Sequence, residues 1–210
     1  MSDNALNTIN KFTKVHLMRS LIFTLLALFT FSTLTNAAEE EHFHYEIALQ
    51  SQFNLEDDQL KSIHMVWLYD NVISDMMLEN EKDLKSFADY LIKDLEGVKY
   101  FSKFIFDDKP LEIKKATNGT IKVIKEGGEE EIQQVQLSFD LPLKKAIKMS
   151  GKHTLKIINT DDSGSAIIFY KDETSLTMDK ALKKHCTPYV KDKKNFDHGE
   201  SAQVVELRCN

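Results

Sequence analysis

The feature that most constrains the fold of this chain is an alternation of apolar and polar residues that recurs along most of its length. In residues 43–53, apolar side chains occupy every second position except Ser51, and in residues 63–69 they occupy every second position. A period of two is typical of a β-strand with one buried face. The polar stretch 54–58 between them predicts a turn, so we expect an antiparallel hairpin. Further strands are predicted at 100–106, 111–117, 120–125, 135–141, 153–158, 166–170, 186–190 and 204–208.

Two more hairpins are predicted from turn residues. Asn118-Gly119, which separates two of the predicted strands, is the strongest short-range hairpin signal in a sequence. The polar residues 161–164 predict a second hairpin that joins 153–158 to 166–170.

A helical period interrupts the strands only once. Leu84, Phe87, Leu91 and Leu95 recur at helical spacing, and an earlier stripe begins at Val72. We therefore expect an α+β fold, in which an antiparallel sheet or sandwich receives a helical insert after the first hairpin.

The first 37 residues differ from the rest of the chain. A positively charged stretch precedes the apolar run 21–34, and small residues follow at Thr35 and Ala37. This is the layout of a signal peptide. The run is shorter than the ~20 residues of a membrane helix, although an uncleaved membrane anchor is the alternative. We expect cleavage near Ala37, which leaves a single periplasmic domain at 38–210.

Charge narrows the range of partners. The leader holds three basic residues and one acid, so the formal charge of −6 for the full chain becomes −8 for residues 38–210. A net acidic protein is not expected to bind nucleic acid or anionic lipid.

Cys186 and Cys209 are the two cysteines of the chain. An even count in an oxidising compartment predicts a disulfide, which would contribute about 3 kcal/mol in the chain-entropy model. The alternative is zinc ligation by these cysteines with His185 and His198, but the spacing fits no common zinc motif.

A metal site is predicted at the open end of the first hairpin. His42 and His44 are two residues apart, so in a strand they share one face at roughly 7 Å. Pairing Ile47 with Met65 keeps both apolar sets on one face and brings His42 opposite Asp70. Two imidazoles and one carboxylate suit zinc, and also nickel or cobalt.

Simpler readings exist for the same residues. The two histidines could be exposed polar residues, and Asp70 could cap the helix that follows it. His64, paired with Ala48 in this register, lies too far along the strand to join the site. His198 could be an accessory ligand. Enzyme signatures such as Gly-x-Ser-x-Gly, His-Glu-x-x-His or a P-loop are absent from the sequence, so we expect no enzyme, with a metal-dependent hydrolase as a minor alternative.

Several motifs, taken in order, resemble the DUF1007 family, which is loosely described as a periplasmic component of an uncharacterised ABC-type transport system. They are His42-Phe43-His44-Tyr45-Glu46-Ile47, Trp67-Leu68-Tyr69-Asp70, the helical Met76-Met77-Leu78, Tyr100-Phe101, Asp107-Asp108-Lys109-Pro110 and Phe139-Asp140-Leu141-Pro142-Leu143. The resemblance covers nearly all of the chain after the leader.

The chain also departs from the family pattern. Phe43 stands where the first motif has proline, Asn71 where an acid often follows the aspartate, and Asp108 where the turn has glycine. Residues 79–83 lack an aspartate-rich insert, so we predict no calcium site. A Tyr-Asp-Pro segment is absent near Asp161.

The resemblance implies a partner and a role. Family members often accompany a nickel/cobalt-type inner-membrane permease, and some are implicated in zinc uptake. We therefore expect a periplasmic protein that binds a divalent metal, with a non-metal protein–protein interaction module of the cell envelope as the alternative.

Overall fold

The chain forms two β-sheets in the part of it that the computed structural model describes, which is residues 45–80, 83–126, 132–161, 165–191 and 203–210. One sheet has six strands and the other has five. The predicted α+β class is therefore wrong, and the protein is β-rich. Within the described ranges, helix is confined to two α-helices and three single turns of 3-10 helix.

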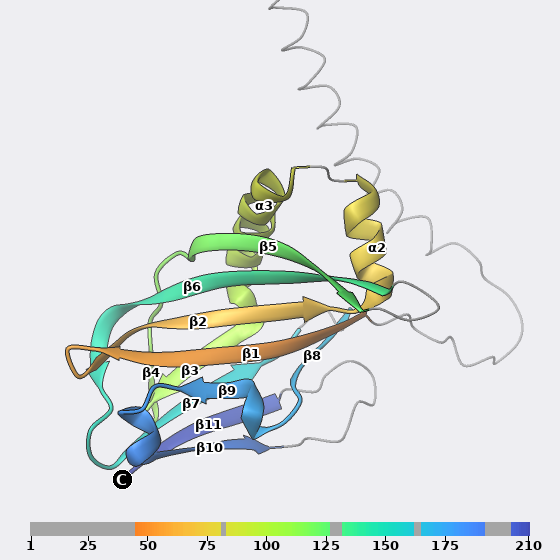
Figure 1. Ribbon diagram of the computed structural model, residues 1–210. Coiled ribbons are helices and arrows are strands. Elements are labelled where there is room, and N and C mark those ends of the chain that lie inside the picture. The colour runs from red at the N-terminus through yellow and green to blue at the C-terminus, as the bar shows by residue number, and fades with distance from the viewer. Residues whose placement is uncertain (1–44, 81–82, 127–131, 162–164, 192–202) are drawn as a thin grey trace, which may run out of the picture. The chain divides into compact units, whose positions relative to one another are not determined.

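The larger sheet has the strand order β5-β6-β2-β1-β8, and β9 also pairs with β1 (Figure 1). Strand β1 is antiparallel to β2 but parallel to β8 and β9. The sheet is therefore mixed, and not antiparallel throughout as predicted. Its strands are β1 (Tyr45–Glu56), β2 (Gln59–Tyr69), β5 (Thr117–Glu126), β6 (Ile132–Lys148), β8 (Ala166–Tyr170) and β9 (Leu176–Met178).

The smaller sheet has the order β10-β11-β7-β3-β4. Its strands are β3 (Ser102–Phe106), β4 (Lys109–Pro110), β7 (His153–Asn159), β10 (Cys186–Lys191) and β11 (Gln203–Cys209). The hairpin predicted between 153–158 and 166–170 is wrong, because β7 and β8 belong to different sheets. Strand β8 instead pairs with the start of β1, from Tyr45 opposite Ala166 to Leu49 opposite Tyr170.

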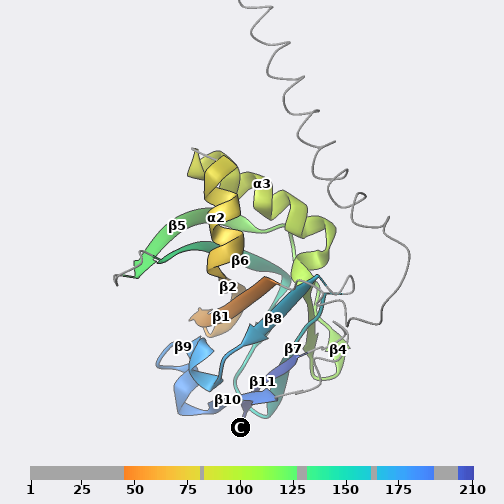
Figure 2. The same cartoon turned by 90° about the vertical axis from the view of Figure 1, so that its right-hand side faces the viewer.

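Both α-helices stand over the β5–β6 end of the larger sheet (Figure 2). They are α2 (Asn71–Asn80) and α3 (Leu84–Gly97). Asp83 caps α3, because its side chain accepts the backbone N–H groups of Lys85 and Ser86. Helix α3 packs so closely on β5 that a Cβ added to Gly119 would lie 2.1 Å from Cδ1 of Ile92.

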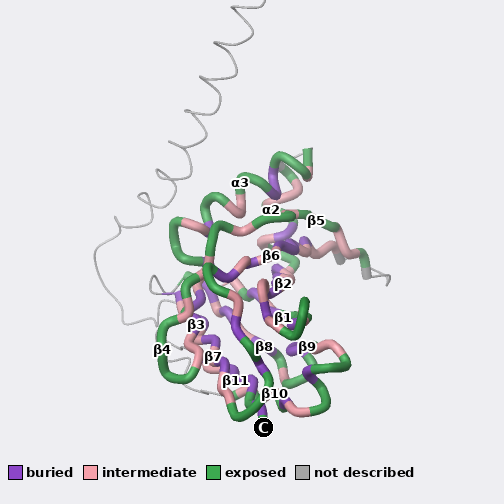
Figure 3. The backbone as a smooth tube through the Cα atoms, turned by 90° about the vertical axis from the view of Figure 1, so that its left-hand side faces the viewer, coloured by how far each residue is buried: buried purple, intermediate pink, exposed green. Residues whose placement is uncertain are grey.

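The core is built from the faces that the alternating pattern predicts, as the purple segments of Figure 3 show. Along β2, the side chains of Ile63, Met65 and Trp67 are fully buried, while the intervening residues are partly exposed. Burial of a side chain of this size contributes about 1.5–3 kcal/mol. The alternate residues of β2 point to the other face of the sheet, which is partly exposed.

Three consecutive residues with left-handed backbone conformation connect α3 to β3. Lys99, Tyr100 and Phe101 have φ values of 53°, 54° and 46°, a conformation that costs a non-glycine residue roughly 1–2 kcal/mol. Burial offsets this cost, because the Tyr100 ring packs 5.7 Å from that of Phe139 and its Oη accepts the Ala116 N–H at 2.9 Å.

The hairpin predicted at Asn118-Gly119 is also wrong. Both residues lie inside β5, where the pairing with β6 shifts register between Thr117 and Thr120. The positive φ of Asn118, 57°, therefore serves a β-bulge and not a turn. Residues 111–116 form no strand apart from an isolated bridge between Ile113 and Leu143.

Candidate functional site

Asp70 lies at the open end of the first hairpin, where β2 ends and α2 begins. Its Oδ1 accepts the Ile73 N–H at 2.9 Å, which caps α2. Its Oδ2 accepts the Glu46 N–H at 2.7 Å, and its own N–H donates to the Glu46 carbonyl at 3.0 Å. One carboxylate thus ties the start of β1 to the start of α2.

The register predicted for this hairpin is wrong by four residues. Ile47 pairs with Tyr69, whereas Met65 pairs with Ser51. A shift by an even number keeps every side chain on its predicted face, which is why the alternation could not detect it. Glu46, and not His42, is therefore the residue opposite Asp70.

The turn, together with a register shift between Phe53 and Leu55, explains the difference from the predicted pairing. Strand β1 continues to Glu56, and the chain reverses at Asp57 and Asp58, whose φ values are 52° and 61°. Two successive residues with positive φ are typical of a two-residue type I′ turn. The prediction of a longer turn at 54–58 is therefore wrong, and a pair of aspartates is a weaker turn signal than Asn-Gly.

His42 and His44 lie outside the described residues. Among the residues with described positions, no group of three histidine, cysteine, aspartate or glutamate side chains is arranged to hold a metal ion. Of the predicted ligands, the structure therefore places only Asp70, whose two oxygens each accept one backbone N–H.

A hydrogen-bonded relay of three side chains, which the sequence does not predict, lies on the outer face of the larger sheet. His64 Nδ1 lies 2.7 Å from Asp140 Oδ1, and Asn118 Nδ2 donates to Asp140 Oδ2 at 2.7 Å. The relay crosses β2, β6 and β5. If the imidazole is neutral, a carboxylate at Nδ1 favours a proton there and leaves Nε2 as an acceptor. His64 pairs with Gln52 and not with Ala48 as predicted.

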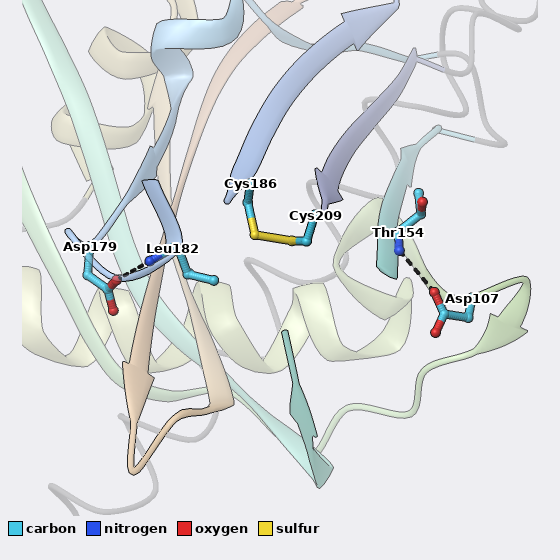
Figure 4. Close-up of a disulfide and its surroundings, with 6 residues drawn as sticks. All are labelled: Asp107, Thr154, Asp179, Leu182, Cys186 and Cys209. Carbon is cyan, nitrogen blue, oxygen red and sulfur yellow. Dashed lines mark hydrogen bonds between the residues drawn. A yellow bond between two sulfur atoms is a disulfide. The ribbon is translucent and has the colours of Figure 1, made fainter. Parts of the chain in front are cut away.

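A second histidine is held by a carboxylate in the smaller sheet. His153 Nδ1 lies 2.7 Å from Asp107 Oδ2, and its ring stacks on Phe106 with centroids 5.2 Å apart. The Thr154 N–H donates to Asp107 Oδ1 at 2.9 Å (Figure 4). This backbone hydrogen bond is the main cause that lowers the pKa of Asp107, and the bond from His153 adds to it.

The predicted disulfide is confirmed. Cys186 and Cys209 are directly opposite each other on β10 and β11, and their sulfur atoms are bonded (Figure 4). No free cysteine remains, so these residues are not zinc ligands in this structure. His198, the proposed accessory ligand, lies outside the described residues.

In the described residues, the protein is a β-rich, two-sheet protein with one disulfide and two histidines that are each hydrogen-bonded to a carboxylate. The chain belongs to the family described as "Protein of unknown function (DUF1007)", whose model matches residues 25–204. The resemblance seen in the sequence motifs is therefore confirmed. No curated protein matches the chain. Within the described ranges, no helix is long and apolar enough to cross a membrane.

Proposed function

We propose that this protein is a periplasmic accessory protein that binds a divalent metal ion, with zinc as the first choice, and works with an inner-membrane permease. The observation that supports the proposal best is the hydrogen bond from the Glu46 N–H to Asp70. Glu46 is two residues after His44 in the sequence. This bond therefore holds the Asp70 carboxylate against a residue that closely follows the His42-Phe43-His44 motif.

The donor set suits a borderline divalent ion. Two imidazole nitrogens with a carboxylate oxygen fit zinc, and also nickel or cobalt. A carboxylate has about four acceptor positions, and the two backbone N–H groups on Asp70 use two of them. Asp70 could therefore take part in ligation without releasing the α2 cap. Acid protonates imidazoles, so metal binding should weaken below neutral pH.

Equilibrium dialysis against zinc, followed by elemental analysis, tests the proposal. We expect the processed wild-type protein to retain about one zinc per chain, and the variant His42→Ala/His44→Ala to retain far less. The matched control is His64→Ala/His153→Ala, which also removes two imidazoles but should bind zinc as wild type does. Equal binding by wild type and His42→Ala/His44→Ala would refute the site.

A single substitution tests the part played by Asp70. Asp70→Asn keeps an oxygen that can cap α2 but removes the charge. We expect zinc affinity to fall at least about tenfold, while the loss of one of the two N–H acceptors should lower the free energy of unfolding by no more than about 1 kcal/mol. Unchanged affinity would restrict Asp70 to its structural role.

The second candidate function is a protein–protein interaction module, and the outer face of the larger sheet favours it. In Figure 1, β5, β6, β2 and β1 lie in front of α3 and of strands β3 and β7 of the smaller sheet. Half-buried apolar side chains, which alternate with the buried core residues of the same strands, lie on the face away from the core at Ala48, Val66, Leu68, Ile167 and Phe169. A contiguous apolar surface of this kind is typical of an interaction site.

Calorimetry and cross-linking separate the two candidates. Absence of heat on titration with zinc, nickel and cobalt, together with a specific cross-link to the permease from a photoreactive residue at Leu68, would favour the interaction module. Lys103, on β3 of the other sheet and exposed, is the control position. Cross-linking from both positions alike would argue against docking on this face.

A further inference from the structure

We propose that the end of the molecule at the turn of the β1–β2 hairpin binds the surface of an anionic lipid bilayer. We name this surface the lysine end. Five exposed lysines define it, namely Lys148, Lys152, Lys180, Lys183 and Lys184. They come from segments far apart in the sequence, so only the fold brings them together.

Strand pairing brings two of these lysines to the hairpin turn and the neighbouring strand ends. Lys148, at the end of β6, pairs with Gln59, which directly follows the Asp57-Asp58 turn. Lys152 precedes β7, whose first residue, His153, pairs with Cys209. Figure 3 looks onto this side of the molecule, where much of the chain around β9, β10 and the C-terminus is exposed.

Asp179 fastens the other three lysines to the same end. Its side chain accepts the Leu55 N–H from the end of β1 at 2.6 Å and the Leu182 N–H at 2.8 Å. The second bond, drawn in Figure 4, starts the 3-10 turn η3 (Leu182–Lys184). Cys186 follows this turn, and its disulfide to Cys209 holds the start of β10 two strands away from the start of β7.

The positive charges at this end outnumber the nearby negative charges. Among the described residues, none of the five lysines forms an ion pair or a side-chain hydrogen bond. Glu56 and Asp57 share a single cation, since they lie 3.5 and 2.8 Å from Lys61 Nζ, and Asp58 and Asp179 keep their negative charges because a backbone N–H is neutral. These four carboxylates and Lys61 sum to −3 against +5 for the five lysines, so the lysine end keeps a net positive charge.

The chemistry of the lysine end favours a phosphate-rich surface over a protein partner. Protein interfaces depend on buried aromatic and apolar anchors. The large exposed hydrophobic residues of the described chain are Val72, Met76, Tyr90, Val98 and Tyr189, and none is in the segments that carry the five lysines. A cluster of four to eight basic residues without such anchors is typical of attraction to anionic lipid headgroups.

The net negative charge of the protein does not oppose this proposal. Interactions between exposed charges are screened beyond a Debye length of about 8–10 Å at physiological salt. The bilayer would therefore respond to the charges at the contacting end and not to the average over the chain. The net charge excludes anionic lipid as a partner only if the charges are evenly distributed over the surface, and here they are not.

Vesicle sedimentation tests the proposal. The processed protein is mixed with phosphatidylcholine vesicles that contain or lack phosphatidylglycerol, at low and at physiological salt, with EDTA present so that metal binding plays no part. We expect binding only to the vesicles that contain phosphatidylglycerol, and weaker binding as salt rises. Failure to bind these vesicles at low salt would overturn the proposal, whatever the result of zinc dialysis.

Charge-matched variants locate the contact. Lys180→Gln/Lys183→Gln/Lys184→Gln should lower the vesicle affinity roughly tenfold to a hundredfold, and Lys148→Gln/Lys152→Gln should lower it in the same direction. The control, Lys93→Gln/Lys103→Gln/Lys122→Gln, removes the same charge from exposed positions elsewhere and should bind nearly as wild type does. An equal loss in the control would show a general charge effect and overturn the assignment to this end. Free inorganic phosphate should not compete at low concentration; if it does, a phosphate site replaces the bilayer surface.

Discussion

The two ends of the β1–β2 hairpin are built by the same device but offer different chemistry. At the open end, Asp70 accepts one N–H from the start of β1 and one from α2. At the turn end, Asp179 accepts one N–H from the end of β1 and one from η3. The Asp70 carboxylate binds the start of β1, which directly follows His42 and His44 in the sequence. The Asp179 carboxylate anchors a turn that carries lysines without ion-pair partners. The comparison teaches that a carboxylate in this fold is not by itself evidence of a metal site, because Asp179 also accepts two backbone N–H groups and has no pair of histidines near it, only His185.

The largest expected effect comes from the disulfide, which lies at the turn end of the hairpin and has no counterpart at the open end. Cys186→Ser/Cys209→Ser should lower the free energy of unfolding by about 3 kcal/mol. Urea unfolding followed by circular dichroism measures the change. The zinc affinity of the open end should be unaffected. A loss of stability well below 1 kcal/mol would mean that the rest of the fold holds the start of β10 without the bond.

Removal of the Asp179 carboxylate should cost less than the disulfide. Asp179→Ala leaves the Leu55 and Leu182 N–H groups without their acceptor in a partly buried setting, which should cost about 2 kcal/mol. Denaturant unfolding is again the measurement, and vesicle binding should fall because η3 loses its anchor. Asp179→Asn keeps one acceptor and is the milder control; if it costs as much as alanine, charge and not hydrogen bonding dominates.

Removal of the Asp70 carboxylate should cost about 1 kcal/mol. It also accepts two N–H bonds, but the one from Glu46 lies in an exposed setting, where water can replace a lost partner. The same unfolding experiment on Asp70→Ala measures this difference. A cost larger than that of Asp179→Ala would reverse the order of the two carboxylates.

The smallest expected effect is on the pH dependence of stability. Burial works to raise the pKa of Asp179, but the backbone hydrogen bonds from Leu55 and Leu182 lower it overall. A carboxylate whose pKa is lower in the folded state stabilises the protein above its unfolded pKa of about 3.9, and this contribution is lost as pH falls through the folded value. Asp179→Asn should therefore flatten the stability curve on the acid side of pH 4. An unchanged acid limb would contradict the lowered pKa.

Local patterns in the sequence predicted the strands far better than their partners. The alternation located the buried faces of β1 and β2, and the cysteine count predicted the disulfide. The register of the first hairpin could not be predicted from the same pattern, because a shift of four residues leaves both faces unchanged. The Asp57-Asp58 turn and the register shift between Phe53 and Leu55 decide it together, and aspartate pairs are common outside such turns.

Contacts between distant segments account for the remaining errors. Strand β8 was assigned to a hairpin with β7 because the two are neighbours in the sequence, whereas it pairs in parallel with β1. The relay of His64, Asp140 and Asn118 depends on the register of three strands and on a bulge at Asn118. No periodicity in a single segment contains that information.

The most direct test of the account is a zinc titration of the isotope-labelled processed protein followed through its backbone amide resonances. Zinc should shift the signals of Glu46, Asp70 and Ile73 at the open end and leave those of Leu55 and Leu182 at the turn end unchanged. Shifts at the turn end, or none at the open end, would contradict the division of roles between the two ends of the hairpin.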